Sequence, residues 1–97
     1  MPLSLFGAIW KQINMKVKHF LTEKNWTQQV YRRLTATGPK YCLVGAIRFC
    51  YPEMNQDIIQ KVNDYLLTYY KEYAVVWNDQ PEREFKEVKE LINVLDI

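Results

Sequence analysis

An almost uninterrupted apolar stretch, residues 41–51, constrains the fold of this chain more than any other feature. Arg48 is its only charged residue, and Pro52 follows it directly. A segment that is apolar on nearly every side is typical of a helix buried on several faces, and Pro52 would end such a helix. Gly45 and Ala46 lie at its centre and leave room for another backbone to approach closely. The sequence therefore predicts a central, buried helix.

Three further segments show the three- and four-residue apolar spacing of amphipathic helices. They cover residues 4–24, residues 55–73 and the region from Asp79 onward. Ser4, Asn55 and Asp79 are the expected N-caps, because short polar side chains accept the free backbone N–H groups of a first helical turn. These helices are predicted to pack around the central one.

Two shorter segments lie between these helices. A further short helix within residues 25–37 is predicted from apolar residues at four-residue spacing: Trp26, Val30 and Leu34. Gly38 and Pro39 would end it. Residues 74–77 are β-prone but have no evident partner strand, so we expect an extended connection there. The predicted fold class is all-α, a compact bundle of four to five helices forming a single helical domain over residues 1–97.

Composition narrows the class of protein further. The chain has 97 residues, 48% of them hydrophobic and 25% charged, which fits one small globular domain. No apolar run reaches the roughly 18 residues of a membrane span, so we expect a cytoplasmic protein. The first helix could also lie on an anionic membrane, but its apolar stripe is needed to close so small a core.

Cysteine and histidine are too few for most metal sites. If Cys42 and Cys50 share one helix, their Cα atoms lie roughly 12 Å apart, which is too far for a disulfide. We therefore expect reduced thiols. One histidine and two cysteines without close ligand spacing predict no metal site, and no cofactor is expected.

Charge is distributed unevenly along the chain, although its net value is only +2. Residues 1–52 contain eight Lys or Arg and one acidic residue, whereas residues 53–97 contain five and ten. A surface of one sign attracts a partner of the opposite sign, so we expect a protein partner with an acidic surface. The candidate binding residues are Lys24, Arg32, Arg33, Lys40 and Arg48. Nucleic acid is the second choice, because a pI of 8.5 is low for a duplex-binding domain.

Cys42 supports an alternative function, a thiol-dependent enzyme. It lies in the first turn of the predicted central helix, where the helix dipole and the charge of Lys40 would lower a thiol pKa. His19 would act as the base, and Asn78 or Asp79 would orient it. However, a free cysteine on an apolar helix is usually a buried thiol, and GxSxG, HExxH and phosphate-loop motifs are absent. We therefore predict no enzymatic activity.

Four tyrosines near the end of the helix predicted over residues 55–73 allow a second alternative. They are Tyr65, Tyr69, Tyr70 and Tyr73. Tyrosine rings can stack on the bases of a nucleic acid. Tyr69 and Tyr73 nevertheless fall near the middle of the apolar arc, so we predict that they pack in the core with their hydroxyl groups at its edge.

Three short stretches resemble an uncharacterised family of small bacterial and phage proteins, a domain of unknown function. They are Trp26-Thr27-Gln28, residues 42–47 with Cys42 and Gly45, and Trp77-Asn78-Asp79-Gln80-Pro81 followed by Val88. The resemblance implies a helical fold without an established activity. It also implies structural roles for the motifs: an aromatic anchor at Trp26, a helix with Cys42 and Gly45, and a cap at Asn78 and Asp79 that opens the last helix.

The combined prediction is a small non-enzymatic protein-interaction module that acts through its basic N-terminal half. The resemblance and the small size further suggest a phage or mobile-element inhibitor of a host defence complex. The alternatives are a thiol-dependent enzyme centred on Cys42 and a nucleic-acid-binding accessory protein.

Overall fold

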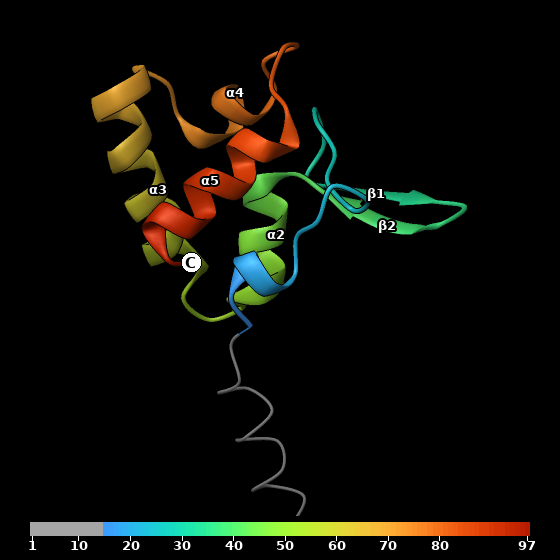
Figure 1. Ribbon diagram of the computed structural model, residues 1–97. Helices are drawn as coiled ribbons and strands as arrows, with labels where there is room; N and C mark the ends of the chain where they lie inside the picture. The colour runs from blue at the N-terminus through green and yellow to red at the C-terminus, as the bar shows by residue number, and fades with distance from the viewer. Residues whose placement is uncertain (1–14) are drawn as a thin grey trace, which may run out of the picture.

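The computed structural model describes residues 15–97, which form a helical body with a β-hairpin projecting from one side (Figure 1). In chain order the elements are the 3₁₀ helix η1 (Val17–His19), β1 (Arg32–Thr35), β2 (Gly38–Tyr41), α2 (Leu43–Cys50), α3 (Asn55–Tyr70), α4 (Ala74–Asn78) and α5 (Phe85–Leu95). Within the described residues, no helix is long and apolar enough to cross a membrane.

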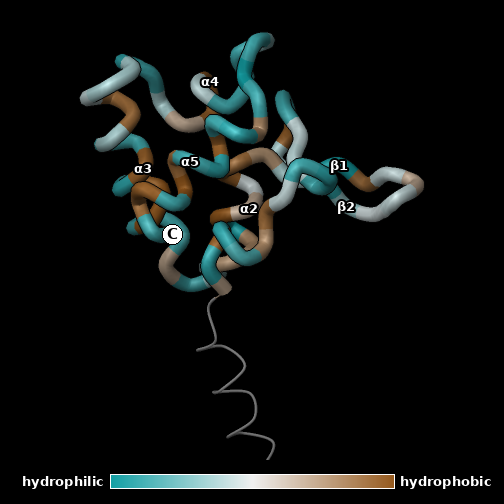
Figure 2. The backbone as a smooth tube through the Cα atoms, viewed as in Figure 1, coloured by the Kyte–Doolittle hydropathy of each residue, from teal (hydrophilic) through white to brown (hydrophobic). Residues whose placement is uncertain are grey.

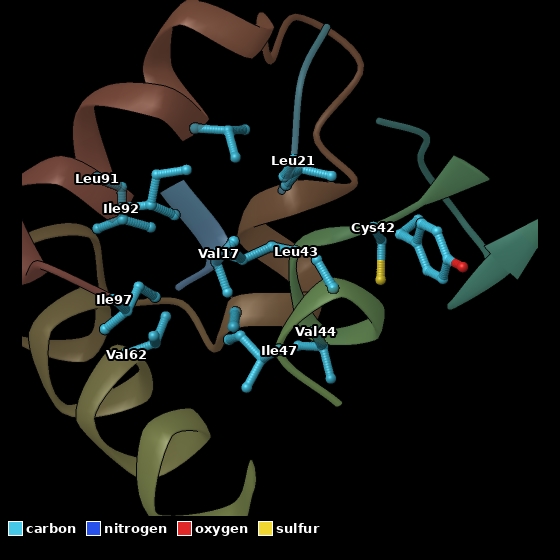
Figure 3. Packing of buried hydrophobic residues seen from close by; sticks show 14 of the residues in the cluster. Val17, Leu21, Cys42, Leu43, Val44, Ile47, Val62, Leu91, Ile92 and Ile97 are labelled. Carbon is cyan, nitrogen blue, oxygen red and sulfur yellow. The ribbon is translucent and has the colours of Figure 1, made fainter. Parts of the chain in front are cut away.

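The core lies between η1, α2, α3 and α5. Figure 3 shows side chains from all four elements pointing toward one another, with Cys42 at the side of the cluster that faces the strands. Several are fully shielded from solvent: Val17, Leu43, Ile47, Val62 and Val88. Figure 2 shows the hydrophobic stretches gathered in the helical body, whereas the hairpin is mostly hydrophilic or neutral.

The prediction of a buried central helix is confirmed, with shorter bounds. α2 buries six of its eight residues and leaves Arg48 and Phe49 exposed. Cys42 is its N-cap, and the Gly45 amide donates a hydrogen bond to the Cys42 Sγ at 3.3 Å. Tyr41, which the prediction placed in this helix, belongs to β2 instead.

The all-α prediction is wrong, because the described residues contain a two-stranded antiparallel sheet and the fold mixes helices with strands. The helix predicted within residues 25–37 is replaced by turns and β1. The four-residue spacing of its apolar residues was misleading, because Val30 and Leu34 are exposed rather than facing the core. Gly38 has a φ of +116°, a conformation that favours glycine, and it follows the tight turn at 36–37.

The helix predicted over residues 4–24 is wrong in the part that the structure describes. Only Val17–His19 is helical there, and Val17 and Leu21 are buried. The chain then turns at Asn25, whose Oδ1 accepts a hydrogen bond from the Thr22 amide at 2.6 Å. Ser4 and the apolar positions of the first half of that helix lie outside the described residues.

The helix predicted over residues 55–73 exists as α3, but Tyr69 and Tyr73 do not lie in the core, whereas Tyr65 packs against it. Asn55 starts the helix rather than capping it, since the N-cap is Met54. Tyr69 and Tyr73 are 68% and 59% exposed. Tyr73 is exposed because α3 ends when Lys71 takes a left-handed conformation with φ of 61°, so the chain leaves the helical spacing before residue 73. Tyr69 lies within α3, on the side of the helix that faces solvent.

The predictions for residues 74–84 are also corrected. Ala74–Asn78 is the helix α4, not an extended connection, and its first turn is held by Asn63 Oδ1, which accepts a hydrogen bond from the Ala74 amide. Asp79 ends α4 and does not open the last helix. The capping box of α5 is formed by Glu84 and Glu87 instead. The predicted apolar stripe of this helix is confirmed: Val88, Leu91 and Ile92 are buried, and Phe85 and Leu95 pack against the core.

Candidate binding surface on the β-hairpin

The register of the hairpin sorts its side chains onto two faces. Arg33 lies opposite Lys40, and Leu34 lies opposite Pro39. Directly paired residues of an antiparallel sheet share a face, and neighbours along a strand alternate between faces. One face therefore carries Arg33 and Lys40, and the other carries Leu34 with Arg32.

Lys24 lies near Lys40, beside β2. It lines a hollow of about 350 Å³ beside β2, together with Lys40. The rest of the lining is uncharged: Asn25, Thr37, Gly38 and Pro39. We call Lys24, Arg33 and Lys40 the cationic face.

The other two predicted basic residues lie elsewhere. Arg32 projects from the opposite side of the hairpin, where its guanidinium lies 5.9 Å from the centre of the Tyr41 ring. Arg48 is on α2, and its guanidinium stacks 4.5 Å above the ring of Tyr31. The five predicted residues therefore divide into a cationic face of three and two arginines held against aromatic rings.

No acidic group neutralises the cationic face from within the described residues. The ion pairs of these residues involve Lys16, Lys18, Arg83 and Lys86, and none reaches the hairpin. The sequence itself contains no Asp or Glu from residue 24 to residue 52. Like charges directly opposite each other in a sheet are destabilising, by about half a kcal/mol. The Arg33–Lys40 pair thus has a cost that an anionic partner would remove.

The sequence analysis did not identify Leu34 as an exposed residue of the candidate surface. Its side chain is 78% exposed, and the prediction had placed it on the buried stripe of a helix. Two aromatic residues close to the hairpin are also exposed, Tyr31 at 47% and Phe49 at 55%. The exposure of Leu34 could have been inferred only if β1 had been predicted as a strand.

The root of the hairpin is fixed to the helical body by the buried side chain of Asn78. Its Oδ1 accepts hydrogen bonds from Trp26 Nε1 at 2.8 Å and from the Leu43 amide at 3.1 Å. Its Nδ2 donates to the carbonyl of Thr27 at 3.2 Å and to Asp79 Oδ1 at 3.0 Å. All four hydrogen-bonding positions of the amide are therefore used, as a fully buried amide requires.

Gln28 and Asp79 complete this junction. Gln28 Nε2 donates to the carbonyls of Asn78 and Gln80, both at 2.8 Å. Asp79 Oδ1 accepts a hydrogen bond from the Gln29 amide at 2.8 Å, where Gln29 has a φ of 73°. These contacts join the segment before β1 to the end of α4 and so set the direction in which the hairpin projects.

A family model of unknown function, DUF6197, matches residues 11–94 of the chain. The chain belongs to this family. The resemblance to an uncharacterised family is confirmed by that match. No curated protein and no solved structure matches the sequence. In this DUF6197 protein the three stretches that carried the resemblance meet in space, because Asn78 bonds to Trp26 and to the backbone of α2. The cap expected at Asn78 and Asp79 is therefore a junction between segments rather than the start of the last helix.

The Cys42 thiol of this DUF6197 protein is buried, and its pKa is raised rather than lowered. Cys42 is 3% exposed. Burial raises the pKa of its thiol above the ordinary value, and the nearby Asp79 carboxylate raises it further. The Gly45 and Val44 amides oppose this rise only in part. Among the described residues, no hydrogen bond joins His19 to Cys42. A nucleophilic cysteine needs the opposite shift, toward the thiolate.

We therefore expect Cys42 to react slowly with iodoacetamide in the folded protein at neutral pH. Cys50 serves as an internal comparison, because burial raises its pKa to about 12. Peptide mass spectrometry after timed labelling should show both cysteines protected in buffer and rapidly alkylated in urea. Labelling of Cys42 in buffer as fast as in urea would instead favour a thiol-dependent enzyme.

Proposed function

We propose that this protein is a non-enzymatic protein-interaction module that binds an acidic protein surface through its projecting β-hairpin. The observation that carries the proposal is the cross-strand pair of Arg33 and Lys40, two cations that face each other without an acidic neighbour. Repulsion within this pair lowers the free energy of unfolding, and binding of an acidic partner removes that repulsion. Lys24 adds a third charge beside Lys40.

The exposed apolar residues near these charges favour a protein partner over a nucleic acid. Leu34 projects into solvent from the same hairpin, and Tyr31 and Phe49 are exposed near its root. Protein interfaces are enriched in aromatic residues and arginine. A duplex-binding surface would be expected to carry more cations than the three of the cationic face. The more specific hypothesis, a phage or mobile-element inhibitor of a host defence complex, stays a prediction.

The proposal makes an unusual prediction for Arg33→Glu, namely loss of binding together with a gain in stability. The new glutamate would lie opposite Lys40 and turn a repulsive pair into an attractive one, which raises the free energy of unfolding by about 1 kcal/mol. Capture of the partner should nevertheless be lost. Affinity purification from the native host with mass spectrometry measures the first effect, and urea unfolding measures the second.

Lys89→Glu is the matched control, because it makes the same charge change at an exposed position of α5. It should capture the same proteins as the natural sequence. If Arg33→Glu retains its partners, the cationic face is not the binding surface. If the captured material is lost after nuclease treatment and its amount falls steeply with salt, the partner is a nucleic acid and the proposal is wrong.

A further inference from the structure

We infer that the outer edge of β1 is a docking site for an extended, acidic segment of the partner, which adds to the hairpin as a third strand. This inference rests on the proposed function and names the form in which the acidic partner is recognised. Strand addition is a common mode of peptide recognition, in which backbone hydrogen bonds give affinity and alternate side chains give specificity.

The backbone pattern shows which groups of β1 point away from β2. The Tyr31 carbonyl accepts a hydrogen bond from the Cys42 amide at 3.3 Å, so the groups of Tyr31 face β2. Backbone groups alternate along a strand, which directs those of Arg33 toward β2 as well. The N–H and C=O groups of Arg32 and Leu34 therefore point outward, and within residues 15–97 no hydrogen bond to them is formed.

The outer edge of β2 is closed to the same use. The Tyr41 amide donates to the carbonyl of Asn25 at 2.7 Å, and the Tyr41 carbonyl accepts from the Thr27 amide at 2.9 Å. Pro39, which shares the outward register of Tyr41, has no N–H group to offer. The hairpin thus has one protected edge and one open edge, and the open one is β1 (Figure 1).

The side chains along β1 define the sequence that would fit. A strand added beside β1 places every second side chain on the face that carries Arg33 and Lys40, directly next to Arg33 and one strand away from Lys40. The side chains between them lie on the other face, beside the exposed Leu34. The favoured occupant is therefore a protein segment in which acidic and apolar residues alternate.

A synthetic peptide of alternating Glu and Val, blocked at both ends, is the probe for this inference. Its affinity for the full chain is measured by isothermal titration calorimetry. Leu34→Pro removes one outward N–H group and leaves the ladder to β2 intact, as Pro39 does at the paired position. Leu34→Ala is the matched control, because it removes the same side chain but keeps the N–H. We expect Leu34→Pro to bind the peptide about tenfold more weakly than Leu34→Ala, because one backbone hydrogen bond is lost and its partner in the peptide is left unsatisfied.

Amide hydrogen exchange gives a second measurement that needs no variant. In the free protein the amides of Arg32 and Leu34 should exchange quickly, whereas that of Arg33 is protected by β2. Binding of the peptide should slow exchange at Arg32 and Leu34. Attraction between charges alone would not produce this alternating pattern.

The outcomes separate this inference from the proposed function. If Arg33→Glu abolishes peptide binding but Leu34→Pro and Leu34→Ala bind equally, the cationic face stands and the edge inference is overturned. If Arg33→Glu binds as tightly as the natural sequence, the proposed function fails as well. Failure of the natural sequence to bind the peptide, or dimerisation that Leu34→Pro abolishes, also overturns the inference, the latter because a second copy then occupies the edge.

Discussion

Replacing Asn78 with alanine lowers the free energy of unfolding by about 3 kcal/mol, because several buried polar groups lose their partners at once. The indole N–H of Trp26, the Leu43 amide and the Thr27 carbonyl each depend on this side chain. Alanine offers neither an acceptor nor a donor, and Asn78 itself is fully buried. Chemical denaturation followed by circular dichroism measures the loss.

Asn93→Ala is the matched control for this substitution. Asn93 is exposed on α5, and among the described residues its side chain forms no hydrogen bond. Its removal should change the free energy of unfolding by less than about half a kcal/mol. Equal effects of the two alanine substitutions would show that the Asn78 network does not hold the hairpin root to the helices.

Gly45→Ala is expected to have the second large effect, a loss of about 3 kcal/mol through overpacking. A Cβ atom at this position would lie 2.8 Å from the carbonyl carbon of Tyr31 and closer still to its oxygen. Both groups belong to backbone, so neither can turn aside as a flexible side chain would. In an exposed helix the same substitution would be stabilising by about 1 kcal/mol, so the sign of the result decides whether this contact exists.

Amide exchange locates the damage in Gly45→Ala. The Tyr31 backbone, just before β1, must move away from α2. The Cys42 amide, which donates to the Tyr31 carbonyl, should therefore exchange faster. Amides in the middle of α5 should change only through the loss of global stability. A variant that unfolds at the same denaturant concentration as the natural sequence would contradict the tight packing of Gly45 against the Tyr31 backbone.

Helices with a strong apolar pattern could be predicted from the sequence. α2 follows from a run of apolar residues in which Arg48 is the only charge, and α5 from the spacing of Val88, Leu91 and Ile92. In both, burial of one continuous surface decides the local structure. The start of α2 was predicted less well. Tyr41 belongs to β2 because its backbone N–H and C=O form hydrogen bonds with Asn25 and Thr27, which are distant in sequence.

The strands could not be predicted in the same way. Trp26, Val30 and Leu34 have helical spacing, yet Val30 and Leu34 are exposed and the Trp26 indole bonds to Asn78, 52 residues later. A hairpin that projects into solvent has no buried face and hence no alternating pattern to detect. The opposite error occurred at residues 74–77, which were predicted to be extended because they include β-branched residues. They form α4 instead, because tertiary contacts override the local preference.

The sequence identified the basic residues of the candidate site but not how they are arranged in space. Lys24, Arg33 and Lys40 were among the five basic residues selected from the charge distribution. The structure pairs Arg33 with Lys40 and places Lys24 near Lys40. Arg32 and Arg48 were selected on the same grounds but lie against Tyr41 and Tyr31. The hairpin register separates Arg33 and Lys40 from Arg32, and this register is set by the tight turn before Gly38. Because the sequence did not predict the strands, it could not predict this separation.

The long sequence separation between Trp26 and Asn78 has a consequence for synthesis of the chain. On the ribosome, the segment that carries both strands emerges well before α4. Until residue 78 has left the exit tunnel, the indole of Trp26 and the first amide of α2 have no permanent partner. The hairpin therefore acquires its fixed orientation only after residue 78 has left the tunnel, and until then its open strand edge is exposed without the support that directs it.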